Sequence, residues 1–164
     1  MKAALSWLRD FAPFDGDPTE LSAVLDDLGL VVEGVDRVGE GLESVVVARV
    51  DGIAAIEGAD RIRLVTVDTG DGPLDIVCGA TNFAVGDLVP LAPVGAVLPG
   101  GFEIARRKMR GVVSNGMLCS GRELGLSDDH EGLLILNDVE GARPGLGVAE
   151  LLGIEPDVVF DITV

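Results

Sequence analysis

The chain has 164 residues, of which 48% are hydrophobic, and its 28 acidic and 12 basic side chains give a formal net charge of -16. This length allows one ordinary domain, or a domain with a small second lobe, and the charge excludes a protein that binds nucleic acid over its whole surface. Two cysteines, Cys78 and Cys119, suit neither a metal site nor a secreted disulfide scaffold. No segment reaches the roughly 18 apolar residues of a membrane span, so we expect a soluble, reduced protein of the cytoplasm with no membrane partner.

The first forty residues predict two helices followed by a strand. Apolar residues recur at helical spacing over residues 3–11, and we expect Trp7 to pack inward, with a partner-binding anchor as its alternative role. Asp17 lies directly before a proline and three residues before Glu20, which is the spacing of a capping box. This pattern predicts the start of a second helix. Residues 30–38 alternate imperfectly and predict a strand.

Short strands separated by turn residues dominate the middle of the chain. Gly52 interrupts the first of them where a bulge would bend the strand. The predicted strands are residues 44–56, 61–69, 74–78, 88–92, 102–104, 109–113 and 116–119. So many short strands within about 80 residues are typical of an all-β barrel or sandwich.

The last part of the chain predicts elements that return to the first lobe. We expect a strand at residues 133–136, a short helix ending at Gly153, and a strand at residues 158–162. That last strand is the natural partner of the strand at 30–38. The predicted organisation is α+β, with a lobe formed by residues 1–39 and 148–164 and a β domain formed by residues 40–147.

No catalytic constellation is recognisable in the sequence. His130, the only histidine, has no serine or cysteine nucleophile at a characteristic spacing. The acidic loop 127–131 could bind a divalent cation, but it lacks the ligand spacing of an EF-hand, and a solvated loop is favoured. Cys119 could be a reactive thiol, although a small buried residue is the more common role.

A basic cluster is the best functional candidate in the sequence. Four of the cations fall within five positions: Arg106, Arg107, Lys108 and Arg110. Their guanidinium and ammonium groups could contact phosphates, and the alternative is a solvated face. Arg61 and Arg63 share one strand face by the two-residue period and could extend the cluster.

Several ordered runs of the sequence carry a resemblance to a known family. The runs are residues 59–64, 67–70, 76–80, 94–100, 108–120 and 123–128. Together they resemble the N-terminal part of the bacterial phenylalanine-tRNA ligase β subunit. The resemblance implies a five-stranded oligonucleotide-binding (OB-fold) β-barrel inserted into the small discontinuous lobe. It also implies an α2β2 parent enzyme that attaches phenylalanine to its tRNA with ATP and Mg²⁺, at a site on the α subunit.

The resemblance also implies roles for individual residues and partners. The residues that match related tRNA-binding domains are Arg61, Lys108, Arg110, Ser114, Asn115 and Met117. The implied partners are tRNA(Phe), the remainder of the β subunit and the α subunit, with no DNA. We expect a non-catalytic module that binds or orients tRNA and holds no cofactor itself. The alternative is a structural module for subunit interaction with little or no RNA binding.

Overall fold

Residues from both ends of the chain form one folded unit, and the residues between them form another. The computed structural model describes all residues, 1–164. The smaller unit contains residues 1–40 and 155–164, and the larger unit contains residues 41–154. Most of the regular structure is strand, with three short helices in the whole chain. None of these helices is both long and apolar enough to cross a bilayer.

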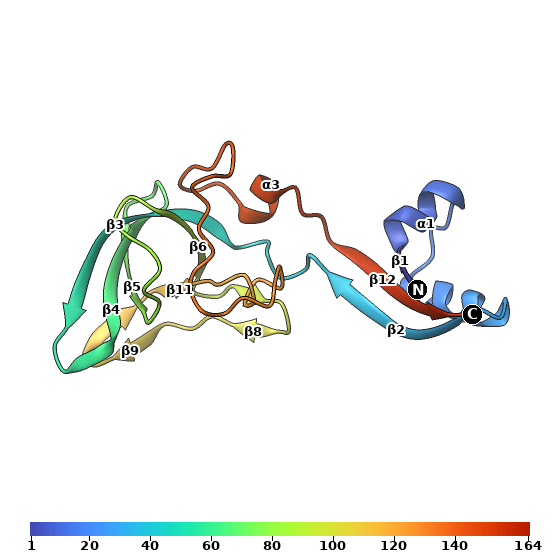
Figure 1. Ribbon diagram of the computed structural model, residues 1–164, viewed down its shortest axis with the longest axis horizontal. Helices are drawn as coiled ribbons and strands as arrows, with labels where there is room; N and C mark the ends of the chain where they lie inside the picture. Colours follow the sequence, from blue (N-terminus) through green and yellow to red (C-terminus); the bar gives the residue numbers. More distant parts are fainter. The chain divides into compact units, whose positions relative to one another are not determined.

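The smaller unit is a three-stranded antiparallel sheet with two helices. Its elements are β1 (Lys2–Ala4), α1 (Leu5–Phe11), α2 (Pro18–Asp27), β2 (Val31–Val38) and β12 (Asp157–Thr163). The strand order is β1-β12-β2, so the C-terminal strand lies in the centre (Figure 1). The predicted pairing of this strand with the strand at 30–38 is therefore confirmed. Fully buried Phe160 on β12 lies in the core of this unit, with Leu5 and Leu25 from the two helices.

Helix α2 begins as its sequence predicts. The Asp17 carboxylate accepts hydrogen bonds from the amides of Thr19 and Glu20, at 2.7 and 3.0 Å. The Glu20 side chain accepts in return from the Asp17 amide at 3.3 Å, which completes the capping box. The predicted helix thus forms at its expected position.

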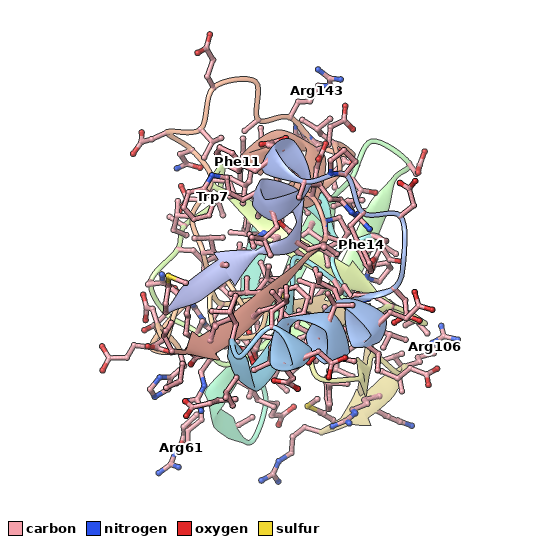
Figure 2. All side chains as sticks on the ribbon, turned by 90° about the vertical axis from the view of Figure 1, so that its right-hand side faces the viewer. Trp7, Phe11, Phe14, Arg61, Arg106 and Arg143 are labelled. Carbon is pink, nitrogen blue, oxygen red and sulfur yellow. The ribbon has the colours of Figure 1, made fainter.

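Helix α1 contradicts the expectation that Trp7 packs inward. Trp7 is 58% exposed and Phe11 is 79% exposed, and their rings meet edge-on with centroids 6.4 Å apart (Figure 2). Leu5 is the buried residue of this helix. A helix of only two turns buries a narrow stripe, and here that stripe passes through Leu5 and leaves Trp7 outside.

The larger unit contains a five-stranded antiparallel sheet and two short hairpins. The sheet strands are β3 (Val46–Ile56), β4 (Ala59–Asp68), β5 (Pro73–Cys78), β6 (Leu88–Pro93) and β11 (Gly116–Leu118). The remaining elements are β7 (Val97–Leu98), β8 (Phe102–Glu103), β9 (Arg107–Met109), β10 (Val112–Ser114) and α3 (Val148–Leu152). The strand order is β11-β6-β3-β4-β5, and β7-β8 and β9-β10 pair separately (Figure 1). The strand pairing forms open sheets and contains no closed barrel.

Three local features of this unit bear on the predictions. The register between β3 and β4 shifts between Val50 and Gly52, so the predicted bulge at Gly52 is confirmed. The predicted strand 109–113 is instead the turn of the β9-β10 hairpin. Residues 133–136 form no strand, and this segment is held by separate backbone bonds such as Leu136 N–H to the Leu88 carbonyl at 2.8 Å.

Helix α3 lies in the larger unit, whereas residues 148–164 were all predicted in the small lobe. Val148 is fully buried in a cluster with Leu42 and Val45. Its amide also donates to the Val45 carbonyl at 2.9 Å. Burial and this hydrogen bond fix the helix to the larger unit, because an apolar stripe packs where a complementary core is available.

Candidate functional site

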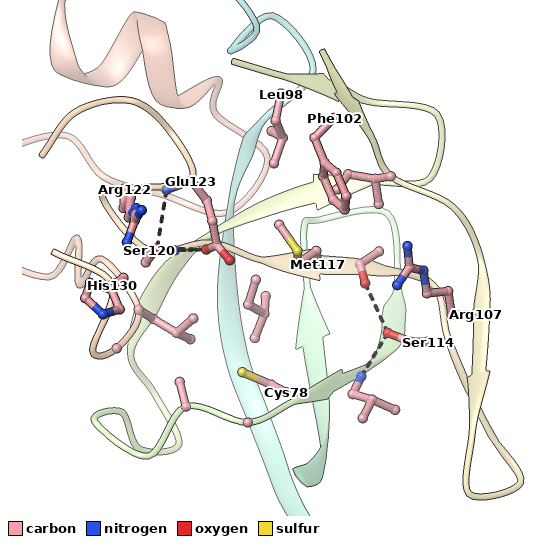
Figure 3. A pocket seen from close by; sticks show the side chains of 18 of the residues that line it. Cys78, Leu98, Phe102, Arg107, Ser114, Met117, Ser120, Arg122, Glu123 and His130 are labelled. Atoms are coloured by element: carbon pink, nitrogen blue, oxygen red, sulfur yellow. Dashed lines mark hydrogen bonds between the residues drawn. The ribbon is translucent and has the colours of Figure 1, made fainter. Parts of the chain in front are cut away.

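An open pocket of about 810 Å³ lies on the larger unit (Figure 3). Its wall comes from the end of β5, the β7-β8 and β9-β10 hairpins, strand β11 and the segment 120–133. Its lining includes the apolar side chains of Leu98, Met117 and Leu118, together with polar and charged side chains such as those of Arg107, Glu123 and His130. The pocket thus combines apolar walls with a few polar and charged groups, the usual construction of a ligand site.

The β9-β10 hairpin carries the basic cluster of the sequence. Met109 pairs with Val112, so Arg110 and Gly111 form a two-residue turn with φ values of 51° and 82°. Positive φ at both central positions is the type I′ pattern that joins tightly paired strands. Arg110 is the only residue other than glycine with positive φ in the chain. The turn thus holds an arginine in a conformation that is sterically unfavourable for a residue with a Cβ atom.

The alternation of strand β9 divides the basic cluster between two faces. Arg107 and Met109 both line the pocket, and Figure 3 shows Arg107 on the side of the pocket where Ser114 lies. Lys108, the residue between them, faces the opposite side by the two-residue period of a strand. Arg106 precedes the strand and projects outward from the ribbon in Figure 2. The hairpin therefore presents cations on both of its faces.

None of the cations of the hairpin is paired with an acid. Arg106, Arg107, Lys108 and Arg110 are all exposed. The ion pairs of the protein use the N-terminal amine and the side chains of Lys2, Arg37 and Arg49. In a chain with 28 acids and 12 basic residues, the hairpin is a local concentration of uncompensated positive charge.

The two arginines of β4 have different surroundings. Arg61 is exposed and projects outward in Figure 2. Arg63 donates to the Ala80 carbonyl at 2.8 Å, and its guanidinium lies 5.2 Å from the centre of the Phe83 ring. The Nε of Arg63 is buried without a partner. Arg63 thus contributes to packing between β4 and the segment after β5, and neither arginine lines the pocket.

The three other candidate residues lie where β10 leads into β11: Ser114 ends β10, Asn115 follows it, and Met117 is on β11. Ser114 is 3% exposed, and its hydroxyl accepts from the Val77 amide at 2.9 Å and donates to the Gly116 carbonyl at 3.0 Å. The Asn115 amide donates to the Asp75 carbonyl at 2.9 Å. Ser114 and Met117 line the pocket and Asn115 does not. Of the nine candidate residues, the pocket therefore brings together Arg107, Ser114 and Met117.

The segment after β11 contributes charged residues that were not among the candidates. Glu123 accepts at Oε2 from the Ser120 amide at 2.6 Å and from the Ser120 hydroxyl at 2.8 Å. Arg122 and His130 also line the pocket, on the same side in Figure 3. The spacing of serine and glutamate three residues apart is a capping-box signal, and it could have pointed to a fixed carboxylate here.

The cysteines form a buried part of this region. Burial raises the pKa of Cys119 to about 12, and it also raises the pKa of Cys78, which lines the pocket. Thiols are nucleophilic as thiolates, so neither has the character of an activated nucleophile. No group of three or more His, Cys, Asp or Glu side chains is arranged to hold a metal ion.

The fold and the pocket define a β-sheet domain with a ligand-sized recess beside a cationic hairpin. Residues 45–143 match the family described as putative tRNA binding domain, and the chain belongs to this family. Phenylalanine–tRNA ligase beta subunits from Geobacter metallireducens and Syntrophotalea carbinolica are 48% and 44% identical over 162 residues, which is 99% of this chain and 20% of each relative. The resemblance seen in the sequence is thus confirmed, and the chain spans about a fifth of the length of these relatives.

A solved structure also resembles part of the chain. The MetRS related protein from Pyrococcus horikoshii is 19% identical, covers 63% of this chain and 87% of its own, and superposes with a TM-score of 0.44.

Proposed function

We propose that this chain is a non-catalytic accessory module that binds or orients tRNA through phosphate contacts at the β9-β10 hairpin. The observation that carries the proposal is the set of exposed cations on this hairpin without acidic partners, in a protein of net charge -16. Lysine and arginine contacts to phosphate position a protein on nucleic acid and supply most of the sequence-independent affinity. Membership of the putative tRNA-binding domain family supports tRNA as the polyanion.

The acidic remainder of the surface gives the hairpin a directional role. Phosphates are repelled by most of a surface with this net charge and attracted by one hairpin. The two faces of the hairpin, with Arg107 on one and Lys108 on the other, allow contact with phosphates on either side of it. Such an arrangement restricts the bound RNA to few orientations, because most of the surface offers it no attractive contact.

We further propose that the five-stranded sheet belongs to the OB-fold type. The two edge strands of the sheet, β5 and β11, support this proposal because they approach each other. The Asn115 amide, immediately before β11, donates to the Asp75 carbonyl of β5 at 2.9 Å. The bulge at Gly52 supports it further, because bulges increase the curvature of a strand. OB-folds are partly open barrels that bind oligonucleotides on one face.

We propose that the module acts within a phenylalanine–tRNA ligase. The relatives that share 44% and 48% identity with the chain are beta subunits of that name. In this proposal tRNA(Phe), the rest of a β subunit and an α subunit are the partners, and ATP and Mg²⁺ serve the parent α2β2 enzyme at sites outside this chain. Purified chain incubated with phenylalanine, ATP and tRNA is expected to form no aminoacyl-tRNA, and measurable turnover would contradict the non-catalytic role.

The test of tRNA binding is a fluorescence titration of labelled tRNA with the chain at several salt concentrations. If four phosphates are contacted, affinity falls by about 50- to 150-fold between about 50 mM and about 200 mM salt. The double variant Arg106→Gln with Lys108→Gln is expected to lower the slope of log affinity against log salt by about 1.5. The control, Lys2→Gln with Arg37→Gln, removes the same charge from ion-paired positions and is expected to leave the slope unchanged.

A structural interaction module is the second candidate function. The exposed edge-to-face pair of Trp7 and Phe11 favours it, because large exposed aromatics are enriched in protein interfaces. The salt titration separates the two functions: absence of tRNA binding at low salt contradicts the RNA role and leaves the interaction role.

A further inference from the structure

We propose that the pocket of the larger unit binds one unstacked nucleobase that carries an exocyclic amino group, with Glu123 as the residue that accepts from that group. The proposal rests on the proposed function, since the base would belong to the RNA whose phosphates meet the hairpin. It adds base preference to an interaction that phosphate contacts alone leave independent of sequence.

The size and the walls of the pocket suit a base. Its volume of about 810 Å³ lies in the range of small-molecule sites. Figure 3 shows the Phe102 ring and Met117 at one wall, and Phe102 is 49% exposed despite lining the pocket. An exposed aromatic face at the wall of a recess offers a stacking surface for a base, and stacking of this kind tolerates every base. Stacking therefore provides affinity, and selectivity has to come from polar groups.

The Glu123 carboxylate is the polar group with a fixed position. Both hydrogen bonds from Ser120 end on Oε2, and Ser120 is itself 5% exposed. These bonds anchor one oxygen and leave Oε1 free to accept from a ligand. Figure 3 shows the carboxylate at the pocket, in line with its place among the lining residues. An ionised carboxylate accepts hydrogen bonds and donates none, so its partner on the base has to be a donor.

This acceptor distinguishes the four bases of RNA. Adenine, cytosine and guanine each carry an exocyclic amino group whose N–H bonds can reach a carboxylate oxygen. Uracil has no amino group. In a uridine nucleotide its one ring N–H lies between two carbonyl groups, and their oxygens repel an approaching carboxylate. A single charge-assisted hydrogen bond of this kind is worth about tenfold or more in affinity. The pocket is therefore expected to disfavour uracil.

The hairpin connects the pocket to the proposed phosphate contacts. Arg107 lines the pocket and lies on the strand that also carries Lys108. Arg122 lines the pocket too, next to Glu123 in the chain. A nucleotide with its base in the recess would thus have its phosphate near cations and its amino group near Glu123.

The test compares short labelled oligouridines in which one central position is adenine, cytosine, guanine or uracil, titrated with the chain at low salt. The expected result is about tenfold tighter binding of the three amino-bearing oligonucleotides than of oligouridine. Equal binding of all four, with the salt dependence of the hairpin retained, would overturn the base pocket and leave the proposed function intact.

The variant Glu123→Gln tests the residue without removing the Ser120 contacts. Its amide oxygen can accept from Ser120, while its amino group replaces the free acceptor with a donor. The preference against uracil is expected to fall below about threefold, or to reverse, because uracil carbonyls can accept from the new donor. The control is Glu131→Gln, which removes an equal charge from another lining residue and is expected to raise affinity for all four oligonucleotides alike. An unchanged base preference in Glu123→Gln would refute the role of Glu123.

Free nucleosides report on the pocket without phosphate contacts. Adenosine and cytidine are expected to shift the NMR signal of the Met117 methyl group, and uridine is expected to shift it much less. Absence of a shift with any nucleoside would overturn the base pocket, whereas a failure of the proposed function would appear only in the tRNA titration.

Discussion

Replacement of Arg110 by asparagine separates the conformation of this residue from its charge. Arg110 occupies the left-handed region with φ 51°, is exposed, and makes no ion pair or hydrogen bond that would be lost. The left-handed conformation costs an ordinary residue about 1–2 kcal/mol, and asparagine is several-fold enriched there. Asn-Gly is also the preferred pair for a type I′ turn. The variant is therefore expected to be more stable by about 1 kcal/mol, which corresponds to about 2–4 °C in Tm.

The same substitution removes one proposed phosphate contact. The slope of log affinity against log salt for tRNA is expected to decrease by about 0.7–0.9. Thermal melts by circular dichroism measure the first effect and the salt titration the second. The control Lys108→Gln removes a neighbouring cation from ordinary strand geometry, so it is expected to weaken binding without raising Tm. A lower Tm for Arg110→Asn, or an unchanged salt slope, would refute the reasoning.

Two further predictions concern titratable groups. Hydrogen bonds from the Glu20 and Thr19 amides hold the pKa of Asp17 below its ordinary value of 3.8, so its stabilising effect is complete above that value and is lost as pH falls through the lower folded-state pKa. Urea midpoints of the wild type are expected to fall in acid more than those of Asp17→Asn, which caps without ionising; parallel curves would contradict this. Because burial raises the pKa of Cys119 to about 12 and also raises that of Cys78, both thiols are expected to react with an aromatic disulfide reagent only in denaturant. Reaction of Cys119 in the native protein would show that its part of the core opens, and reaction of Cys78 would contradict the expectation that its raised pKa keeps it unreactive.

Local patterns predicted the elements whose signals are contained in a few neighbouring residues. The capping box at Asp17 and the bulge at Gly52 depend on turn and backbone chemistry within a few neighbouring residues. The pairing of residues 158–162 with 30–38 was predictable for another reason, since each was an apolar strand that lacked a partner nearby in the chain.

The errors arose where tertiary packing decided between local alternatives. Residues 109–113 read as one strand, but Gly111 accepts positive φ and lets the chain reverse at Arg110. Trp7 has a helical position compatible with burial, yet the space on that side of the sheet is taken by Leu5 and Leu25. Which of several apolar residues is buried depends on the facing surface, and a single sequence does not contain that information directly.

The pocket was only partly predictable for a geometric reason. Arg107 was a candidate because of its charge. That it faces the pocket while Lys108 faces away follows from the alternation of strand β9, which begins at Arg107. Glu123 and Arg122 lie on a turn that reaches the pocket only through the packing of the segment after β11. Residues that converge from five segments leave no spacing signal in the sequence.

The central position of β12 in the smaller unit has a consequence for biosynthesis. Its neighbours β1 and β2 are made early, but residues 39–156 have to be synthesised before β12 exists. The first forty residues therefore leave the ribosome before the central strand of their sheet has been made. The larger unit can fold before this sheet is complete. Folding of the larger unit shortens the loop that β12 has to close, which reduces the entropic cost of completing the sheet. The last strand of this chain is thus the step that commits its first residues to their native fold.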